Sequence, residues 1–386
     1  MVKEADALQA AGFEVTVLAS DHFEPVRRLD RSILERVAWR SVLLRPQGGR
    51  IARLLGKLRR EVCRIWVVAG RSGTGVAIHA NFERHQEFVS AALRIPADLY
   101  IGHTLSGLAV AATAALQKRA ILGFDAEDWH REEQSESDRR KGQKRAIALI
   151  EEAFVPKCAY VTAASPLIGA AYAALGARTP TTILNVFPLS EAPSSQNGDA
   201  GQIDAVYWFS QTIGPDRGIE AILRAVALLP QQWELHLRGT PSPGYVESLG
   251  CLAESLGMKE RLKWLPPERP DQMVRLAAPY AVGLSVELNQ PPNRAICLTN
   301  KIFTYVLAGT PVLLSDTPAQ TLLAKDLGKA SSVVNIEDSR AVADSILGLC
   351  SVEAREEART LGRERYNWDF ESKALVTSVR QALGVV

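Results

Sequence analysis

The most constraining feature of the sequence is a repeated alternation between short runs rich in β-branched and aromatic residues and longer Ala-rich stretches with helical spacing. Strands that alternate with helices form crossover units on a parallel sheet. We therefore expect an α/β protein. The strands predicted in the first half are EVTVLAS (14–20), DLYIGH (98–103), AILGFD (120–125), YVTAAS (160–165) and TTILNV (181–186).

A second alternating series follows SEAPSSQNGDAGQ (190–202), whose Ser, Pro, Gly and Asn residues are typical of a linker. Two domains also suit the 386 residues, because domains cluster near about 100–200 residues. Ligands of open parallel sheets bind at the carboxyl ends of the strands, so the site is expected to straddle the two halves. The strands predicted in the second half are AVYWFS (205–210), ELHLRG (234–239), RLKWLP (261–266), AVGLSV (281–286) and TPVLLSD (310–316).

The composition, 47% hydrophobic and 23% charged residues, is ordinary for a globular protein. No run of about 18 uncharged apolar residues occurs. The opening segment MVKEADALQ is charged where a signal peptide would be apolar, so we expect a cytoplasmic location. The cysteines show no CxxC pair or zinc spacing and are interpreted as reduced core thiols. They are Cys63, Cys158, Cys251, Cys297 and Cys350.

Positive charge is concentrated in residues 27–71, which hold thirteen Lys or Arg residues against three acids. Apolar residues such as Leu54, Leu58 and Trp66 are interleaved with them. This pattern fits a surface that binds anionic membranes, at the inner face of the membrane for a peripheral protein. The alternative is an ordinary helix surface exposed to solvent, and the pattern favours this alternative slightly over membrane binding. Nucleic acid is not expected as a partner, because no nucleic-acid motif accompanies the basic segment.

Two junctions between a loop and a helix in the second half combine positive charge with free backbone N–H groups. A helix is predicted from Lys301 to Leu307, after Thr299 and Asn300. Lys301 in its first turn adds charge to an anion-binding helix start, although this segment alone also fits a plain capped surface helix.

The other junction lies in AVYWFSQTIGPDRGIEAILRAVALL (205–229). There Arg217 precedes a predicted helix, between Gly214 and Gly218, which allow close backbone approach. Two cationic junctions in one domain predict a nucleotide-diphosphate site.

With these segments in view, the chain resembles glycosyltransferase family 4, whose members are retaining enzymes of the GT-B fold that use nucleotide sugars. The resemblance covers nearly the whole chain and rests on the order of its segments. They are VKEADALQAAGFEVTVLAS (2–20), ADLYIGHTLSGLAVAATAAL (97–116), ILGFDAEDWHREE (121–133), AYVTAASPLIGAAYAALG (159–176), LTNKIFTYVLAGTPVLLSD (298–316) and RYNWDFESKALVTSVRQAL (365–383).

The resemblance implies two Rossmann-like domains facing across a cleft. Residues 1–189 would form the acceptor-side domain and 203–364 the donor-side domain, joined by the linker 190–202. The helix in 365–386 would cross back to the first domain.

The resemblance also implies residue roles. His103 matches a histidine that touches the donor sugar, and Arg217 matches a cationic residue near the phosphates. Asn300 and Lys301 match the "NK" that opens the donor-side helix in one branch of the family.

Several residues depart from the family pattern. Thr304 stands where the family has a glutamate that holds the ribose, and Glu287 is a candidate stand-in for the missing first glutamate of the pair. The family's "D-x-H-E" on the acceptor side reads Asp125, Ala126, Glu127, Asp128, so its histidine is lost.

We therefore predict a hexosyltransferase acting in polysaccharide or glycolipid assembly, with a carbohydrate or lipid-linked acceptor and with no cofactor or metal. A non-catalytic GT-B partner subunit and a nucleotide-sugar epimerase are the alternatives. The chain opens inside the family's first helix, so the resemblance also predicts either a start further upstream or a first domain that has lost its donor-facing loop.

Overall fold

The computed structural model describes residues 1–21, 27–45, 50–71, 73–135, 141–194 and 203–385, without the side chains of 27–30 and 50–53. The chain divides into two compact units. Unit 1 comprises Met1–Ile183 and Ser372–Val386, and unit 2 comprises Leu184–Glu371. Most of the predicted linker, 195–202, lies outside the described residues.

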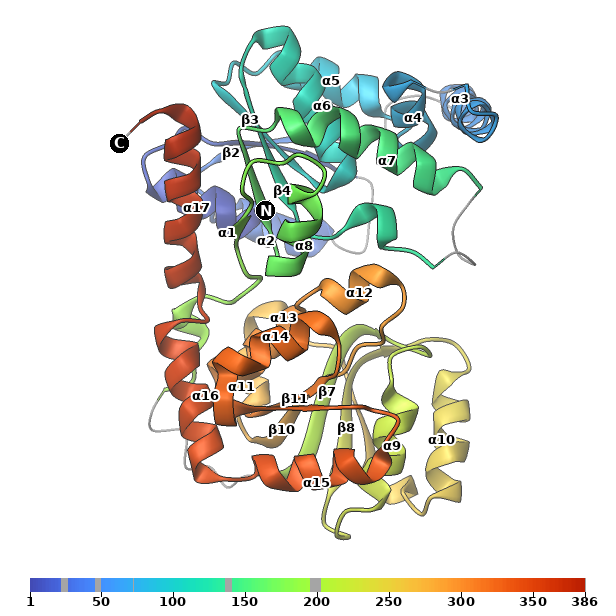
Figure 1. Cartoon of the computed structure of the whole chain (residues 1–386), viewed down its shortest axis with the longest axis vertical. Coiled ribbons are helices and arrows are strands. Elements are labelled where there is room, and N and C mark those ends of the chain that lie inside the picture. Colours follow the sequence, from blue (N-terminus) through green and yellow to red (C-terminus); the bar gives the residue numbers. More distant parts are fainter. Residues whose placement is uncertain (22–26, 46–49, 72, 136–140, 195–202, 386) are drawn as a thin grey trace. The chain divides into compact units, whose positions relative to one another are not determined.

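Unit 2 is built on one six-stranded sheet in which every strand pairs parallel to its neighbours, as the alternating pattern predicted (Figure 1). The strand order is β12-β11-β10-β7-β8-β9, so the first strand of the unit, β7, lies beside the fourth, β10. The strands are β7 (Ile203–Ile213), β8 (Glu234–Pro241), β9 (Leu262–Leu265), β10 (Tyr280–Ser285), β11 (Val312–Ser315) and β12 (Ser331–Val334).

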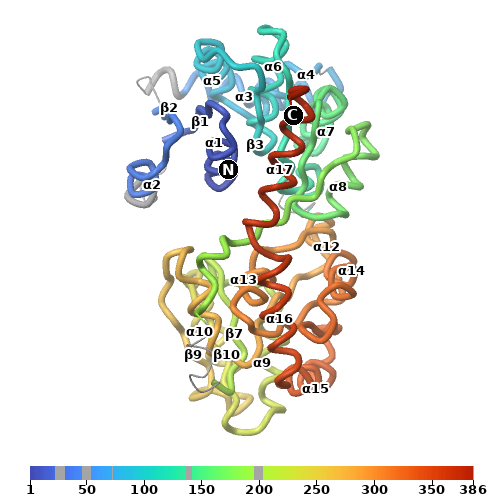
Figure 2. Tube along the Cα trace, turned by 90° about the vertical axis from the view of Figure 1, so that its left-hand side faces the viewer, coloured from blue at the N-terminus to red at the C-terminus, as the bar shows by residue number. Residues whose placement is uncertain are grey.

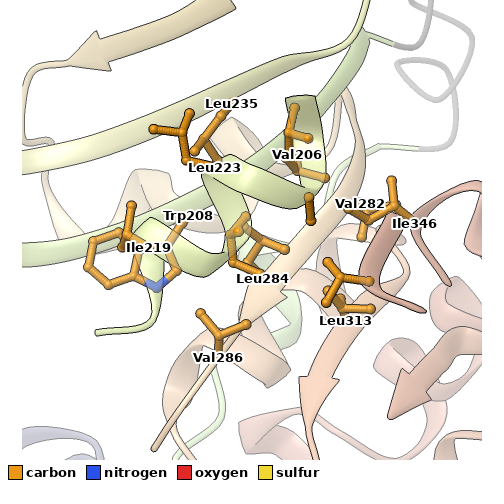
Figure 3. Close-up of a cluster of buried hydrophobic side chains, with 14 of the residues drawn as sticks. Val206, Trp208, Ile219, Leu223, Leu235, Val282, Leu284, Val286, Leu313 and Ile346 are labelled. Atoms are coloured by element: carbon orange, nitrogen blue, oxygen red, sulfur yellow. The ribbon is translucent and has the colours of Figure 1, made fainter. Parts of the chain in front are cut away.

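Helices cover both faces of this sheet. One set, with α9, α10 and α15, buries the cluster drawn in Figure 3, to which Trp208, Leu284 and Ile346 belong. In the set of helices on the other face, α16 lies beside α13 (Figure 2). The helices of unit 2 are α9 (Ile219–Ala227), α10 (Tyr245–Ser255), α11 (Met273–Ala277), α12 (Pro292–Ile296), α13 (Asn300–Ala308), α14 (Pro318–Leu327), α15 (Ser339–Leu349) and α16 (Val352–Glu364).

The described strands of unit 1 form two parallel sheets, β1-β2 and β3-β4-β5-β6. Its strands are β1 (Thr16–Ser20), β2 (Arg40–Leu44), β3 (Leu99–His103), β4 (Ile121–Ala126), β5 (Tyr160–Ala163) and β6 (Thr181–Thr182). Its helices are α1 (Val2–Ala10), α2 (Arg27–Leu34), α3 (Arg50–Val68), α4 (Thr74–Asn81), α5 (His85–Ala92), α6 (Thr104–Lys118), α7 (Gln143–Phe154) and α8 (Pro166–Ala173). The last helix, α17 (Trp368–Leu383), begins in unit 2 and enters unit 1 at Ser372.

The cysteines are free, but the prediction that all are core thiols is wrong. Cys63 and Cys158 are buried, whereas Cys251 and Cys350 are exposed and Cys297 is intermediate. Cys251 and Cys350 lie on or just after amphipathic helices, where a small side chain is tolerated on the solvent face. Among the described residues, no helix is both long enough and apolar enough to cross a membrane.

Candidate active site

The strand order of unit 2 marks a candidate ligand-binding position between β7 and β10. In an open parallel sheet, connections leave neighbouring strands in opposite directions where the strand order reverses, and ligands bind outside the carboxyl ends at that point. Here the order reverses between β7 and β10. The segment containing Arg217 follows β7, and Glu287 follows β10, so both lie at this switch point.

The segment 214–218 turns from β7 into α9 through two residues in left-handed conformation. Asp216 has φ 60° and Gly218, the N-cap of α9, has φ 72°. A Cβ at Gly218 would also lie 2.8 Å from the side chain of Ile336, so glycine is required there. Arg217 is partly exposed and forms no ion pair with any other described residue. Its guanidinium and the uncapped start of α9 can therefore both receive an anion.

The start of α13 carries the second cation, but the structure shows it already paired. Lys301 is only 9% exposed, and its Nζ lies 3.6 Å from a carboxylate oxygen of Glu287 and 5.7 Å from the ring centre of Trp208. Thr299 precedes the helix without a side-chain cap, and Asn300 is partly exposed at the first position. The backbone N–H groups at this helix start thus also lack a side-chain acceptor.

Packing brings the two junctions close together. A Cβ at Gly218 would lie 3.8 Å from Val286, whose neighbour Glu287 holds Lys301. Arg294 on α12 was not among the predicted site residues, yet its guanidinium donates a 2.8 Å hydrogen bond to the carbonyl of Asp216. Its only signal in the sequence is a cation within LNQPPNRAIC (288–297), between the predicted strand 281–286 and the predicted helix that begins at Lys301.

Two further donor-side residues take buried positions. Thr304 is completely buried, and its hydroxyl donates to the carbonyl of Asn300 at 3.0 Å, as a helical threonine often does. Gly214 is buried, and a Cβ there would lie 2.9 Å from the Ser242 hydroxyl. A ribose hydroxyl has no access to Thr304 in this arrangement.

In unit 1, His103 ends β3 and contacts two carboxylates. Its Nδ1 lies 3.1 Å from Asp125 on β4, and its Nε2 lies 3.4 Å from Glu4 on α1. Burial alone would lower the pKa of His103, but the hydrogen bond to Asp125 and the charges of Glu4 and Asp125 outweigh it and raise that pKa. The ring is therefore held ready to donate hydrogen bonds.

Asp125 is buried, yet its surroundings favour the ionised carboxylate. Burial alone would raise its pKa, but the hydrogen bond and charge of His103 and the hydrogen bond from Thr162 lower it. The other acceptor-side residues differ from it, because Glu127 is exposed and the carbonyl of Asp128 accepts a 3.1 Å hydrogen bond from the Tyr172 hydroxyl.

Within the described ranges, the side chains that could hold a metal ion gather in unit 1. One group of three, Glu4, His103 and Asp125, places ligand atoms within 4.8 Å of one another. Bonds from a metal ion to such ligands are about 2.0–2.2 Å long, so side chains at the upper end of this spacing would have to move inward. The expectation of a metal-independent enzyme stays a prediction.

Comparison with known proteins gives a partial match in sequence and a nearly complete match in fold. No family model matches the chain. D-inositol 3-phosphate glycosyltransferase from Mycobacterium ulcerans (strain Agy99) is 29% identical over 192 residues, which is 47% of this chain and 39% of the relative. The protein of the same name from Mycobacterium marinum is 27% identical over 190 residues, with the same coverage. The match thus spans well under half the length of these curated relatives.

Among solved structures, HepE from Anabaena in complex with UDP and glucose matches with a TM-score of 0.69 and 17% identity, covering 95% of this chain and 100% of HepE. Sucrose-phosphate synthase from Thermosynechococcus elongatus matches with a TM-score of 0.68 and 16% identity, covering 99% and 92%. The chain therefore has the GT-B fold with two Rossmann-like domains, as predicted.

The contrast between Lys301 and Arg217 gives a stability prediction. Lys301→Ala should lower the unfolding free energy of unit 2 by about 3 kcal/mol, because it leaves Glu287 buried without its partner. Arg217→Ala should change that free energy by no more than about 0.5 kcal/mol. Native-state hydrogen exchange of the β7 and β10 amides measures both.

The control is the double variant Lys301→Met with Glu287→Leu, which removes both charges and should recover most of the loss. Equal destabilisation by Lys301→Ala and Arg217→Ala would contradict the assignment of a buried pair.

Proposed function

We propose that the chain is a glycosyltransferase that moves a sugar from a nucleotide-diphosphate sugar to an acceptor, with retention of configuration at the sugar. The observation that carries this proposal is the switch point of unit 2, where partly exposed Arg217 and two helix starts without side-chain caps lie together. Two findings support it: the matched curated relatives are named as glycosyltransferases, and HepE was also solved with UDP-glucose. Retention is supported by the resemblance to family 4.

The chemistry asked of this site is stabilisation of the leaving diphosphate. When the bond between sugar and phosphate breaks, negative charge grows on the phosphate oxygens, and fixed donors aimed at it lower the barrier. Arg217 can bind two phosphate oxygens at once, and the N–H groups that open α9 and α13 add fixed dipoles. Lys301 contributes less than Arg217, because Glu287 already neutralises its charge. On this account the transfer needs no metal.

His103 is the proposed sugar-contacting residue of unit 1, since its pKa is raised and its Nδ1 is fixed by Asp125. We assign none of the described residues as a protein nucleophile.

The first test is a screen of UDP-, GDP-, ADP- and dTDP-sugars by thermal shift, because a ligand at 100 times its dissociation constant stabilises by about 2.7 kcal/mol. For the donor that binds, release of the nucleoside diphosphate then measures turnover. Binding without any release would indicate a non-catalytic partner subunit.

Arg217→Ala should weaken binding of the matching nucleoside diphosphate by about 10- to 100-fold, because it removes charge-assisted hydrogen bonds, and should leave the bare nucleoside unaffected. Lys301→Ala should cause a smaller loss. Calorimetric titration measures the affinities, and Arg224→Ala, an exposed arginine on the same helix, is the matched control. Equal losses for diphosphate and nucleoside would contradict the assignment of the site.

We further propose that the acceptor is lipid-linked or lies at an anionic membrane, and that unit 1 docks there through α3 at the inner face of the membrane. The helix packs against α4 and α7 on one side (Figure 1; Figure 2). Its other side carries an exposed apolar stripe at helical spacing, which is typical of helices that lie in a membrane interface. The stripe consists of Leu54, Leu55, Leu58, Val62, Ile65 and Trp66.

Charge selects the kind of surface. Lys57 and Arg59 are exposed next to this stripe, and Arg71 follows the helix. Exposed cations near apolar residues favour an anionic lipid surface over a neutral one. Positions 27–30 and 46–53 of the basic segment lie outside the described side chains.

Vesicle co-sedimentation tests this docking. The chain should sediment with phosphatidylglycerol-containing vesicles and dissociate as salt screens the charges. Leu58→Glu or Trp66→Glu should reduce the bound fraction by about 10-fold, because each buries its side chain in the interface. Leu347→Glu, at an exposed apolar position of unit 2, should have no effect. Binding that ignores salt and these substitutions would rule out α3 as the docking element.

A further inference from the structure

Glu4 lies beside Nε2 of His103, the ring nitrogen that Asp125 does not contact. It stands in the first turn of α1, and its Oε2 is 3.4 Å from Nε2 of His103, while Asp125 occupies Nδ1 at 3.1 Å. The Nε2 to Oε2 distance is about half an ångström longer than a charge-assisted hydrogen bond. The two atoms are therefore adjacent, yet each keeps bonding capacity for a third group.

The backbone around His103 fixes the imidazole in this place. A Cβ at Gly102 would lie 2.5 Å from the backbone of Leu108, so β3 meets the following helix at its closest approach. Thr104, directly after His103, has φ 63°, a conformation that threonine adopts rarely. Such strain is retained where the surrounding structure enforces it, often at functional sites.

A second observation points to a missing polar partner. The Tyr160 hydroxyl is buried and has no hydrogen-bond partner within the described part of the chain. A Cβ at Gly123 would lie 2.8 Å from this hydroxyl, so it sits over β4, on the face from which Asp125 points two residues later. Its neighbour Thr162 donates to Asp125 from the same face. An unpaired buried hydroxyl next to this cluster indicates that a polar group completes it.

We propose that Glu4 and His103 form a hydroxyl-binding pair, in which one carbohydrate hydroxyl accepts a hydrogen bond from Nε2 of His103 and donates one to the carboxylate of Glu4. A hydroxyl has one donor and acceptor lone pairs, which matches the chemistry of a donor and an acceptor side by side. Around a bound hydroxyl the 3.4 Å separation of Nε2 and Oε2 would widen to about 4.5 Å. The inference rests on the proposed function and deepens it. It makes Glu4 a specificity-determining residue.

Protonation of Glu4 gives the pair a pH dependence. Burial raises the pKa of Glu4 to about 7, with Asp125 and, to a smaller extent, Glu127 raising it and His103 and the amino group of Met1 lowering it. Above that pKa, Glu4 is a carboxylate and accepts from the hydroxyl. Carbohydrate affinity should therefore rise as pH increases through about 7, and fall again at higher pH once His103 loses its Nε2 proton, because Asp125 keeps the remaining proton on Nδ1.

The test compares ligands that differ only in the sugar. Calorimetric titrations use UDP, UDP-glucose and its four monodeoxy derivatives, with D-inositol 3-phosphate as an acceptor-side probe. Glu4→Gln should weaken binding of UDP-glucose by about 10-fold relative to binding of UDP, and should abolish the change in affinity near pH 7. The monodeoxy derivative that lacks the hydroxyl held by Glu4 should bind to this variant as it binds to the wild type. If the hydroxyl belongs to an acceptor, the same loss appears with D-inositol 3-phosphate instead.

Controls separate binding from folding. Glu4→Asp keeps the charge and should recover part of the affinity, whereas Glu14→Gln, at an exposed position of the same unit, should behave as the wild type. Thermal unfolding of each variant shows whether α1 stays docked. If Glu4→Gln binds UDP-glucose and D-inositol 3-phosphate with the affinity and pH profile of the wild type, the hydroxyl-binding pair is overturned, while the proposed function stands. A wild-type chain that binds neither UDP nor UDP-glucose overturns the proposed function and the pair with it.

Discussion

The pairing of β7 with β10 is the constraint on which the candidate donor site depends. The sheet of unit 2 grows outward from these two strands. On one side β8 and β9 follow β7, and on the other side β11 and β12 follow β10. Both strands are buried over most of their length, so their register cannot slip without moving the apolar core to which Trp208 and Leu284 belong. The groups beyond their carboxyl ends, at Arg217 and Glu287, inherit that rigidity.

Electrostatics divides the cations of this site into two kinds. Lys301 is buried, and a buried ammonium needs its counter-ion, which Glu287 supplies at 3.6 Å. Arg217 is partly exposed beside a helix start, so it keeps its charge for an incoming anion. In unit 1 the sign is reversed, since Glu4 and Asp125 converge on the single imidazole of His103. One unit is thus suited to phosphate and the other to hydroxyl groups.

Much of this architecture could be predicted from local sequence. All ten strands predicted from the alternating segments are present in the structure, although the one predicted at 181–186 is reduced to Thr181–Thr182. The strands β2 and β12 were missed, because Arg40–Leu44 lies in a basic segment with little burial and Ser331–Val334 begins with two serines and is buried only at its last residue. Strand order was out of reach, since it depends on contacts between residues far apart in the sequence.

The site was predictable in position but not in detail. Glycine and cation patterns indicated Arg217 and Lys301, yet nothing local shows that Glu287, fourteen residues away, takes the charge of Lys301. Glu4 gave no signal, because an acid in the first turn of a helix is ordinary. Its meaning comes only from the fold, which brings α1 to the end of β3.

The most direct measurement is a crystal structure of the chain with UDP bound. The account predicts the diphosphate within hydrogen-bond distance of the Arg217 guanidinium and of the first backbone N–H groups of α9, with the Lys301–Glu287 pair intact. A diphosphate bound beyond β11 and β12, or in unit 1, with Arg217 left in solvent, would contradict it.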